Sequence, residues 1–147
     1  MYSKEESAKI RKEFWVSYGK SFPRKWVLYN TRIKDFSFKF VADRKKAEVT
    51  LDIESSDSIQ RELLFDQLLS LKKILETEFL AEVIFDKDYY LENGKLISRI
   101  YVVHTTKFSI NNKDTWSDCY AFFNETMHQF ELFWYEYQDY IEQAVVK

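Results

Sequence analysis

Acidic residues at alternate positions in two stretches of the sequence could together bind a divalent cation. Asp52 and Glu54 belong to the first stretch, and Asp86 and Asp88 belong to the second. Alternate residues of a β-strand point to one face of a sheet, and hard cations such as Mg²⁺ prefer carboxylate oxygens as ligands. One hypothesis is therefore a metal-dependent hydrolase or nuclease that uses these four side chains as metal ligands. The alternative is a solvated sheet face on which basic residues pair with the acids.

A shorter motif would support the same chemistry. A metal-dependent nuclease needs an Asp on one strand and an acid-x-Lys on the next, so that two carboxylates hold the cation and the lysine steadies the attacking water. The closest match combines Asp35 with Asp43-Arg44-Lys45. Asp43 and Lys45 fall in or beside a predicted turn, at the other end of the strand from Asp35. The motif therefore has poor geometry for a nuclease site.

The two histidines and the single cysteine lack the spacing of a metal site or of a catalytic nucleophile. His104 lies near the end of a predicted strand, whereas Cys119 and His128 lie on the last predicted helix. We interpret all three as structural residues. The two glycines are isolated, so the sequence contains no glycine-rich phosphate-binding loop. We therefore predict no catalytic residue and no cofactor.

The most basic part of the chain runs from Lys20 to Lys34 and contains no acidic residue. Lys and Arg contact phosphates, and an aromatic ring such as that of Trp26 or Tyr29 can stack on a base. We predict that this segment and the basic turn after it bind nucleic acid. The predicted contact residues are Lys20, Arg24, Lys25, Trp26, Arg32, Lys34, Arg44, Lys45 and Lys46. The alternative is a segment that wraps the acidic remainder of the domain, with Trp26 and Tyr29 in the core.

The charges of the chain are unevenly distributed, although the net charge is only −2. Residues 1–46 hold 13 Lys and Arg against 5 Asp and Glu, whereas residues 47–147 hold 9 against 19. Such asymmetry is typical of an anion-binding surface, and equally of basic and acidic elements that pack side by side.

Hydrophobic periodicity, together with cap and turn residues, predicts the elements that position these side chains. A capping box, Ser3-Lys4-Glu5-Glu6, begins the first helix. The predicted order is a helix (4–19), a β-hairpin (36–42 and 47–53), a helix from 58 to about 79, a β-hairpin centred on Asn93-Gly94, and a long C-terminal helix (116–141). We therefore expect a single α+β domain over residues 1–147, with an antiparallel sheet packed on helices.

Turn residues also predict the register of both hairpins. In the first hairpin Ala42 lies opposite Ala47, which places Phe38 opposite Leu51. In the second hairpin Asn93-Gly94 is typical of a type I′ turn, because both central residues of that turn need a positive φ. Counting outward from this turn places Leu91 opposite Leu96 and Asp88 opposite Arg99.

The final predicted helix carries an apolar seam from Trp116 to Ile141, at alternating steps of four and three residues. A second aromatic row beside the seam favours a helix that lies across a sheet. A helix over 113–144 would be about 48 Å long, which is longer than a small sheet is wide. We expect its end either to project, which would expose apolar side chains for self-association, or to break near Asn124. The predicted interface residues are Trp134, Tyr137, Tyr140 and Ile141.

Length and composition limit the class of protein. The chain has 147 residues and a mass of 17.9 kDa, which is the usual size of one domain. A single cysteine suits a reducing compartment, and the sequence has neither a long apolar run nor a signal peptide. We therefore expect a cytoplasmic protein that does not enter a membrane.

Four stretches together resemble a known bacterial family. They are MYSKEESAKIRKEFW, KWVLYNTRIKDFSFKFVADRKKAEVTLDI, ENGKLISRIY and the closing aromatic helix. The chain resembles, over nearly its whole length, the domain-of-unknown-function family numbered 4268. Some members carry this domain behind an endonuclease-like domain, so the resemblance implies an accessory role near nucleic acid. It supplies no functional residues.

These observations favour a non-enzymatic binding or assembly domain over the metal-dependent hydrolase. The expected partners are a second copy of the chain, nucleic acid, or a nuclease-type protein.

Overall fold

The computed structural model describes residues 2–147. The elements in chain order are α1 (Lys4–Ser21), β1 (Phe36–Ala42), β2 (Ala47–Ile53), α2 (Ser58–Leu69), α3 (Lys72–Glu78), β3 (Ile84–Tyr90), β4 (Leu96–Val103), the 3₁₀ turn η1 (Lys113–Thr115) and α4 (Trp116–Glu142). The strands form one antiparallel sheet in the order β1-β2-β4-β3. The predicted α+β class and the order of elements are confirmed, except that the middle helix is divided in two.

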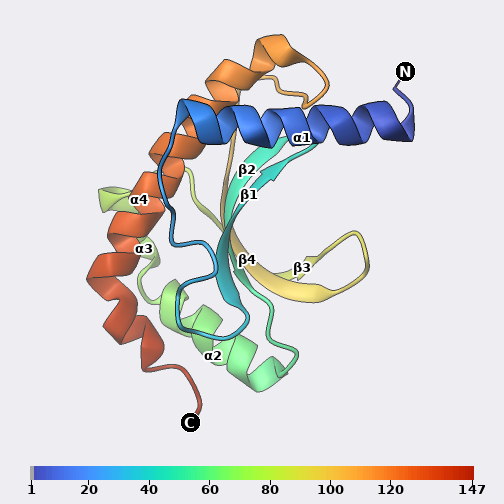
Figure 1. Cartoon of the computed structure of the whole chain (residues 1–147). Coiled ribbons are helices and arrows are strands. Elements are labelled where there is room, and N and C mark those ends of the chain that lie inside the picture. The colour runs from blue at the N-terminus through green and yellow to red at the C-terminus, as the bar shows by residue number, and fades with distance from the viewer. Residues whose placement is uncertain (1) are drawn as a thin grey trace.

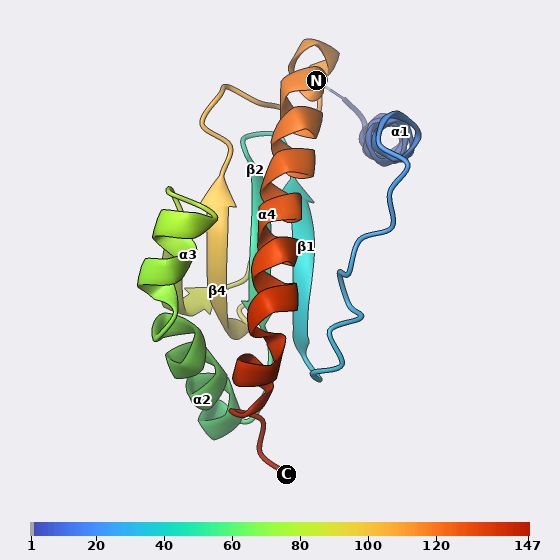
Figure 2. The same cartoon turned by 90° about the vertical axis from the view of Figure 1, so that its left-hand side faces the viewer.

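Helices cover one face of the sheet (Figure 1). Figure 2 looks onto this face and shows α4 along the middle of the sheet, with α2 and α3 beside it on the side of β4. The same view shows α1 end-on, near the end of the sheet where β1 finishes. No described helix lies over the middle of the opposite face, which we call the outer face.

The first helix begins and packs as its sequence predicts. The amide of Glu6 donates to the Ser3 hydroxyl at 3.1 Å, and the Glu6 carboxylate accepts from the Ser3 amide at 3.4 Å, which completes the capping box. Phe14 and Tyr18 are buried against α4, and the Tyr120 hydroxyl donates to the carbonyl of Phe14 at 2.7 Å. This bond ties α1 to the start of α4.

The register of the first hairpin is confirmed. Ala42 pairs with Ala47 and Phe38 pairs with Leu51. The Asp43 carboxylate accepts from the amides of Lys45 and Lys46 at 2.7 and 2.8 Å, so this side chain closes the turn.

The predicted register of the second hairpin is wrong, because the turn holds one residue more. Among residues 91–95 only Gly94 has a positive φ, of 86°, so Asn93-Gly94 does not form a type I′ turn. The Gly94 amide donates to the carbonyl of Leu91, and the Leu91 amide donates to the carbonyl of Lys95. This pattern is that of a turn followed by a glycine bulge. Tyr90 therefore pairs with Leu96.

An irregularity in β3 moves the register once more. The shift lies between Asp86 and Tyr89, and beyond it Asp86, rather than Asp88, pairs with Arg99. A bulge of this kind rotates the strand and redirects its side chains. Tyr89 is thereby free to lie over the outer face, as described below.

The helix predicted to run from 58 to about 79 is interrupted after Leu69. Asp57 caps α2 by accepting from the amides of Ile59 and Gln60. Leu71 leaves the helical conformation, with φ −98° and ψ 3°, and α3 starts at the next residue. The break changes the direction of the helix (Figure 2). Leu75 of α3 is buried, and α2 buries Leu64, Phe65 and Leu68. Ile59 and Leu63 lie on the other side of α2 and are exposed.

The closing helix is the main cover of the sheet. α4 runs without a break through 27 residues, a length of about 40 Å. The buried residues of the predicted seam are Trp116, Tyr120, Phe123, Met127, Phe130, Trp134 and Ile141. No helix in the described part of the chain has both the length and the apolarity needed to cross a membrane.

The expectation that the end of α4 projects from the domain is wrong. Trp134 is 2% exposed and Ile141 is 0% exposed, because α2 runs beside this end of the helix. The Gln67 amide donates to the carbonyl of Tyr140 at 2.7 Å, and the Gln60 amide donates to that of Ala144 at 2.9 Å. Trp134 and Ile141 are therefore core residues, whereas Tyr137 is half-buried and Tyr140 is 37% exposed.

Candidate functional site

The connection between α1 and β1, residues 22–35, forms a groove with the second half of α4. The groove has a volume of 450 Å³. The lining residues come from both segments and include two basic side chains and no carboxylate: Lys25, Trp26, Val27, Asn30, Thr31, Arg32, Trp134, Tyr135 and Gln138. We call it the α4 groove. It brings the predicted basic segment against the helix that was predicted to carry an interface.

Glu131 of α4 holds the start of this connection in place. Its carboxylate accepts from the Arg24 guanidinium at 3.0 Å and from the amide of Val27 at 2.6 Å. The side chain of Glu131 is only 3% exposed, so the ion pair with Arg24 is partly desolvated. An acid within the apolar run Phe130 to Trp134 is the sequence signal that could have revealed this contact.

Two residues of the predicted nucleic-acid site therefore have structural contacts. The Arg24 guanidinium forms an ion pair with Glu131 and lies 3.1 Å from the Nδ1 atom of His128. It also covers the Trp26 ring, at 4.3 Å from the ring centroid. Trp26 is buried and packs edge-on against Phe40. The prediction that Trp26 stacks on a base is thus wrong for the folded domain, because only a small part of the ring reaches the surface.

Other members of the basic set are available at the surface. Lys25 and Arg32 line the α4 groove, and neither forms an ion pair within residues 2–147. Lys20 and Lys34 are exposed on either side of the connection. Tyr29, the second candidate for stacking, is 70% exposed.

The basic residues of the β1–β2 turn lie apart from this groove. Arg44 and Lys45 are exposed, whereas Lys46 is half-buried beside Glu48, at 3.4 Å. The structure therefore divides the predicted basic set between two places.

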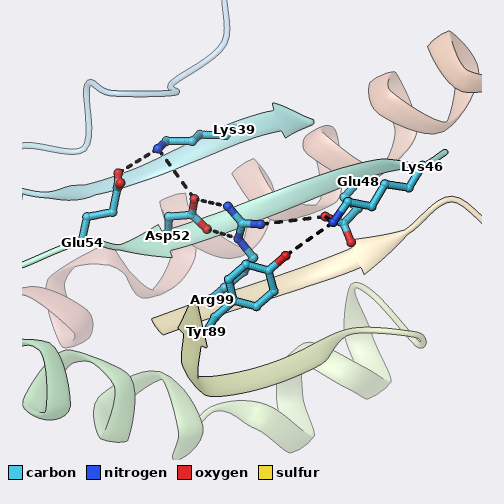
Figure 3. Close-up of polar contacts among 7 residues, drawn as sticks. All are labelled: Lys39, Lys46, Glu48, Asp52, Glu54, Tyr89 and Arg99. Carbon is cyan, nitrogen blue, oxygen red and sulfur yellow. Dashed lines mark hydrogen bonds and ion pairs between the residues drawn. The ribbon is translucent and has the colours of Figure 1, made fainter. Parts of the chain in front are cut away.

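The outer face of the sheet holds a network of buried charges (Figure 3). Asp52 and Arg99, on the two central strands, form a bidentate ion pair with distances of 2.8 and 2.9 Å, and both side chains are buried. Lys39 lies 3.7 Å from Asp52 and donates to Glu54 at 2.8 Å. The Tyr89 ring covers the Arg99 guanidinium, whose Cζ atom is 4.4 Å from the ring centroid.

This network differs from the solvated sheet face expected as the alternative to a metal site. The outer face is polar as expected, yet Glu48, Thr50 and Asp52 are buried. Burial lowers the pKa of Arg99, but the hydrogen bonds to Asp52 and the charges of Asp52 and Glu48 outweigh this effect, and the pKa is raised. The pKa of Lys39 is raised in the same way, against burial, by Glu54 and Asp52. Both cations are therefore held in their charged form.

The four carboxylates of the metal hypothesis are not brought together. Asp52 is occupied by Arg99, and Glu54 by Lys39. The bulge in β3 separates Asp86 from Asp88, which lies 3.5 Å from Arg61 on α2. Among residues 2–147, no three His, Cys, Asp or Glu side chains are grouped so that they could hold a metal ion.

The shorter nuclease motif is not assembled either. The Asp43 carboxylate bonds to the backbone of its own turn. Asp35 lies just before β1, and its carbonyl accepts from the amide of Glu54, at the end of the sheet opposite the turn. The poor geometry predicted for this motif thus has a direct cause, since the length of β1 separates the two acids.

The histidines lie at the edge of the packed core. His128 contacts Arg24, as described above, and His104 packs against Phe122 with ring centroids 4.8 Å apart. Burial lowers the pKa of His104, which favours its neutral form.

Cys119 is buried in α4, and burial raises the pKa of its thiol to about 12. We predict that a thiol reagent labels Cys119 only when the chain unfolds. As the pH rises, the thiol ionises in the unfolded chain, where its pKa is near 9.0, before it ionises in the folded chain. The contribution of Cys119 to the free energy of unfolding is therefore complete below pH 9 and is lost as the pH rises toward 12. Labelling with and without denaturant tests the first statement; equal rates in both would contradict it.

Fold and site together define a class of protein: a small α+β domain whose helices cover one face of a four-stranded antiparallel sheet, with an open groove beside the longest helix. The chain belongs to the family described as Domain of unknown function (DUF4268), whose model matches residues 10–138. This match confirms the resemblance seen in the sequence. No curated protein and no solved structure matches the chain.

Proposed function

We propose that this domain is a nucleic-acid-binding accessory module that holds a single strand in the α4 groove. The observation that carries the proposal is the lining of the groove, which combines Lys25 and Arg32 with an exposed aromatic ring, Tyr135, and has no carboxylate. Basic side chains that follow the backbone, with aromatic rings on which bases stack, are typical of proteins that bind single strands.

The phosphate and the base of a nucleotide each have a counterpart in the groove. Lys25 and Arg32 form no ion pair with any residue of the range 2–147, so both cations can contact phosphates. Tyr135 is 57% exposed, and its ring can stack on a base. The side-chain amides of Asn30 and Gln138 carry donors and acceptors that suit base edges.

The groove is also held in shape before any ligand arrives. Glu131 binds Arg24 and Val27 on one wall, and the hydroxyl of Thr31 donates to the carbonyl of Phe36 at 2.7 Å. Arg32 has a positive φ of 65°, which is uncommon for a residue other than glycine. A preformed groove lowers the entropy that binding must overcome.

We predict that the double variant Lys25→Glu/Arg32→Glu loses most of its affinity for a single-stranded oligonucleotide. Each phosphate contact to a single strand contributes about 0.7 to the slope of log K against log salt, so the slope should fall by about 1.4. Fluorescence anisotropy with a labelled oligothymidylate at several salt concentrations measures both quantities.

The matched control is Lys73→Glu/Lys95→Glu, which makes the same change of charge at exposed positions on α3 and on the β3–β4 turn. This control should bind almost as the unaltered protein does. Equal losses in both double variants would show that only net charge matters, and a protein with no affinity for single or double strands would overturn the proposal.

The other two sequence-based functions have less support. Self-association was expected from exposed side chains at the end of α4, and Trp134 and Ile141 are buried. The metal-dependent hydrolase was expected from four carboxylates, of which two are taken up by ion pairs with Arg99 and Lys39. Both stay predictions, without a site assembled for either.

A further inference from the structure

A second hollow, of 420 Å³, lies where the β1–β2 turn meets the segment after β4. It borders Thr115, just before α4, whereas the α4 groove borders Trp134. These residues are 19 positions apart, or about 28 Å along a helix. We call this hollow the turn pocket, and it is separate from the α4 groove.

The lining of the turn pocket has one sign of charge. Its charged residues are Arg44, Lys45, Lys46 and Lys107, and no Asp or Glu lines it. Three of these cations come from the basic part of the chain, residues 1–46, and Lys107 joins them from residues 47–147, where acidic residues are about twice as frequent as basic ones. Four cations around one hollow repel one another, and an anion between them relieves that repulsion.

Most of this charge is unneutralised within the protein. Lys46 is 3.4 Å from Glu48 and its ammonium is 3.4 Å from the Tyr89 hydroxyl, so it belongs partly to the network of the outer face. Arg44, Lys45 and Lys107 form no ion pair with any described residue. Three cations therefore remain for a ligand.

The uncharged part of the lining supplies hydrogen-bond donors. The hydroxyls of Thr105 and Thr106 have no partner among residues 2–147, and both residues are exposed. The Nε2 atom of His104 is buried without a hydrogen-bond partner among the described residues. A phosphate offers three strong acceptor oxygens, which match hydroxyl and guanidinium donors.

Backbone contacts hold the two sides of the pocket together. The Ile110 amide donates to the carbonyl of Asp43 at 3.0 Å, and the His104 amide donates to that of Ala47 at 2.9 Å. The Asp43 carboxylate fixes the turn that carries the three basic residues. The Thr115 hydroxyl closes the loop by donating to Ser109 at 2.9 Å.

We infer that the turn pocket is a phosphate-binding site, formed by Arg44, Lys45 and Lys107 with the hydroxyls of the 105–106 segment. Its ligand is a phosphate group carried either by a nucleotide or by the backbone of a nucleic acid. Its volume is in the range of small-ligand sites. The site does not depend on the function proposed for the α4 groove.

The test is a calorimetric titration of the full chain with inorganic pyrophosphate. We expect saturable binding. The same titration followed by NMR should show chemical-shift changes confined to the amides of residues 44–46 and 104–109. The variants Arg44→Gln and Lys107→Gln should each weaken binding about tenfold, as expected for the loss of one charge-assisted hydrogen bond. Both residues are exposed, so the variants should fold normally.

The control is Lys25→Gln/Arg32→Gln, which alters the α4 groove and should leave the affinity for pyrophosphate unchanged. Absence of saturable binding would overturn the phosphate site without affecting the groove proposal, and so would variants Arg44→Gln and Lys107→Gln that bind pyrophosphate as tightly as the unaltered protein does. Loss of pyrophosphate binding in the groove variant would overturn it too, because the anion would then bind in the α4 groove.

Two further titrations in the groove variant identify the source of the phosphate. Adenosine triphosphate that binds more tightly than pyrophosphate assigns the pocket to a nucleotide. An oligothymidylate without terminal phosphates that binds more tightly assigns it to a nucleic-acid backbone. Either result supports the site, provided that adding Lys107→Gln to the groove variant weakens the binding of that ligand.

Discussion

Replacing Asp52 by alanine is expected to lower the free energy of unfolding by about 3–5 kcal/mol, because it leaves a buried guanidinium without its carboxylate. Arg99 forms two short bonds to Asp52, at 2.8 and 2.9 Å, and its other carboxylate neighbour, Glu48, is 3.9 Å away. Urea denaturation followed by circular dichroism gives the difference in free energy.

The control for Asp52 is Glu54→Ala on the same strand end. Glu54 pairs with Lys39, but both side chains are partly exposed, and such pairs contribute about 0–1 kcal/mol. A second variant, Asp52→Leu/Arg99→Met, removes both charges and should recover much of the stability, since an apolar pair avoids the cost of desolvation. If Asp52→Ala and Glu54→Ala lowered the free energy of unfolding equally, the buried pair of Asp52 and Arg99 would not have the stabilising role predicted for it.

The second large effect is expected for Trp134→Ala, with a loss of about 3–5 kcal/mol from the cavity left in the core. Trp134 is fully packed, with its ring 5.5 Å from that of Phe36 and 6.1 Å from that of Phe38, measured between centroids. Thermal and urea denaturation measure the loss. The variant should unfold at a lower temperature without any change in the mass of the native protein in solution.

Its neighbour Tyr135 provides a matched control on the same helix. Tyr135→Ala removes an exposed ring and should change stability by no more than about 0.5 kcal/mol. If bases stack on this ring in the α4 groove, the same variant weakens oligonucleotide binding by about 1–3 kcal/mol. A Trp134→Ala variant that kept its stability and changed its mass in solution would instead restore the interface predicted from sequence.

The buried network and the α4 groove lie on different sides of the sheet and have different consequences. On the outer face, acids and bases neutralise one another and leave Asp52 and Arg99 inaccessible. The groove and the turn pocket are lined by basic residues and by no carboxylate, and among these basic residues only Lys46 is paired with a described carboxylate, that of Glu48. The accessible positive charge, rather than the larger charged network, therefore marks the surfaces proposed for binding.

Local features of the sequence were sufficient to predict most of the helices and strands. The capping box at Ser3, the alternation along β1 and β2, and the apolar seam of α4 are each encoded within a few turns or one hairpin. The first register was predictable because a single turn determines it. The second was not, because Gly94 forms a bulge where Asn93-Gly94 normally forms the turn, and β3 shifts again after Asp86.

The sequence predicted only some of the residues that form the candidate sites. It indicated the basic residues Lys25, Arg32, Arg44 and Lys45, because type and clustering are properties of the chain itself. It could not show that Trp26 is buried, since burial depends on which distant side chains meet it.

What the sequence alone determined is the family, the α+β class, the order of elements and the uneven distribution of charge. What only the tertiary structure decided is which charges are neutralised. Lys25 and Tyr135 line one groove, and Arg44 and Lys107 line one pocket, although long stretches of chain separate them. Residues are brought together in this way when helices and strands pack, so no local pattern records it, and the accessible positive charge emerges only from the packed domain.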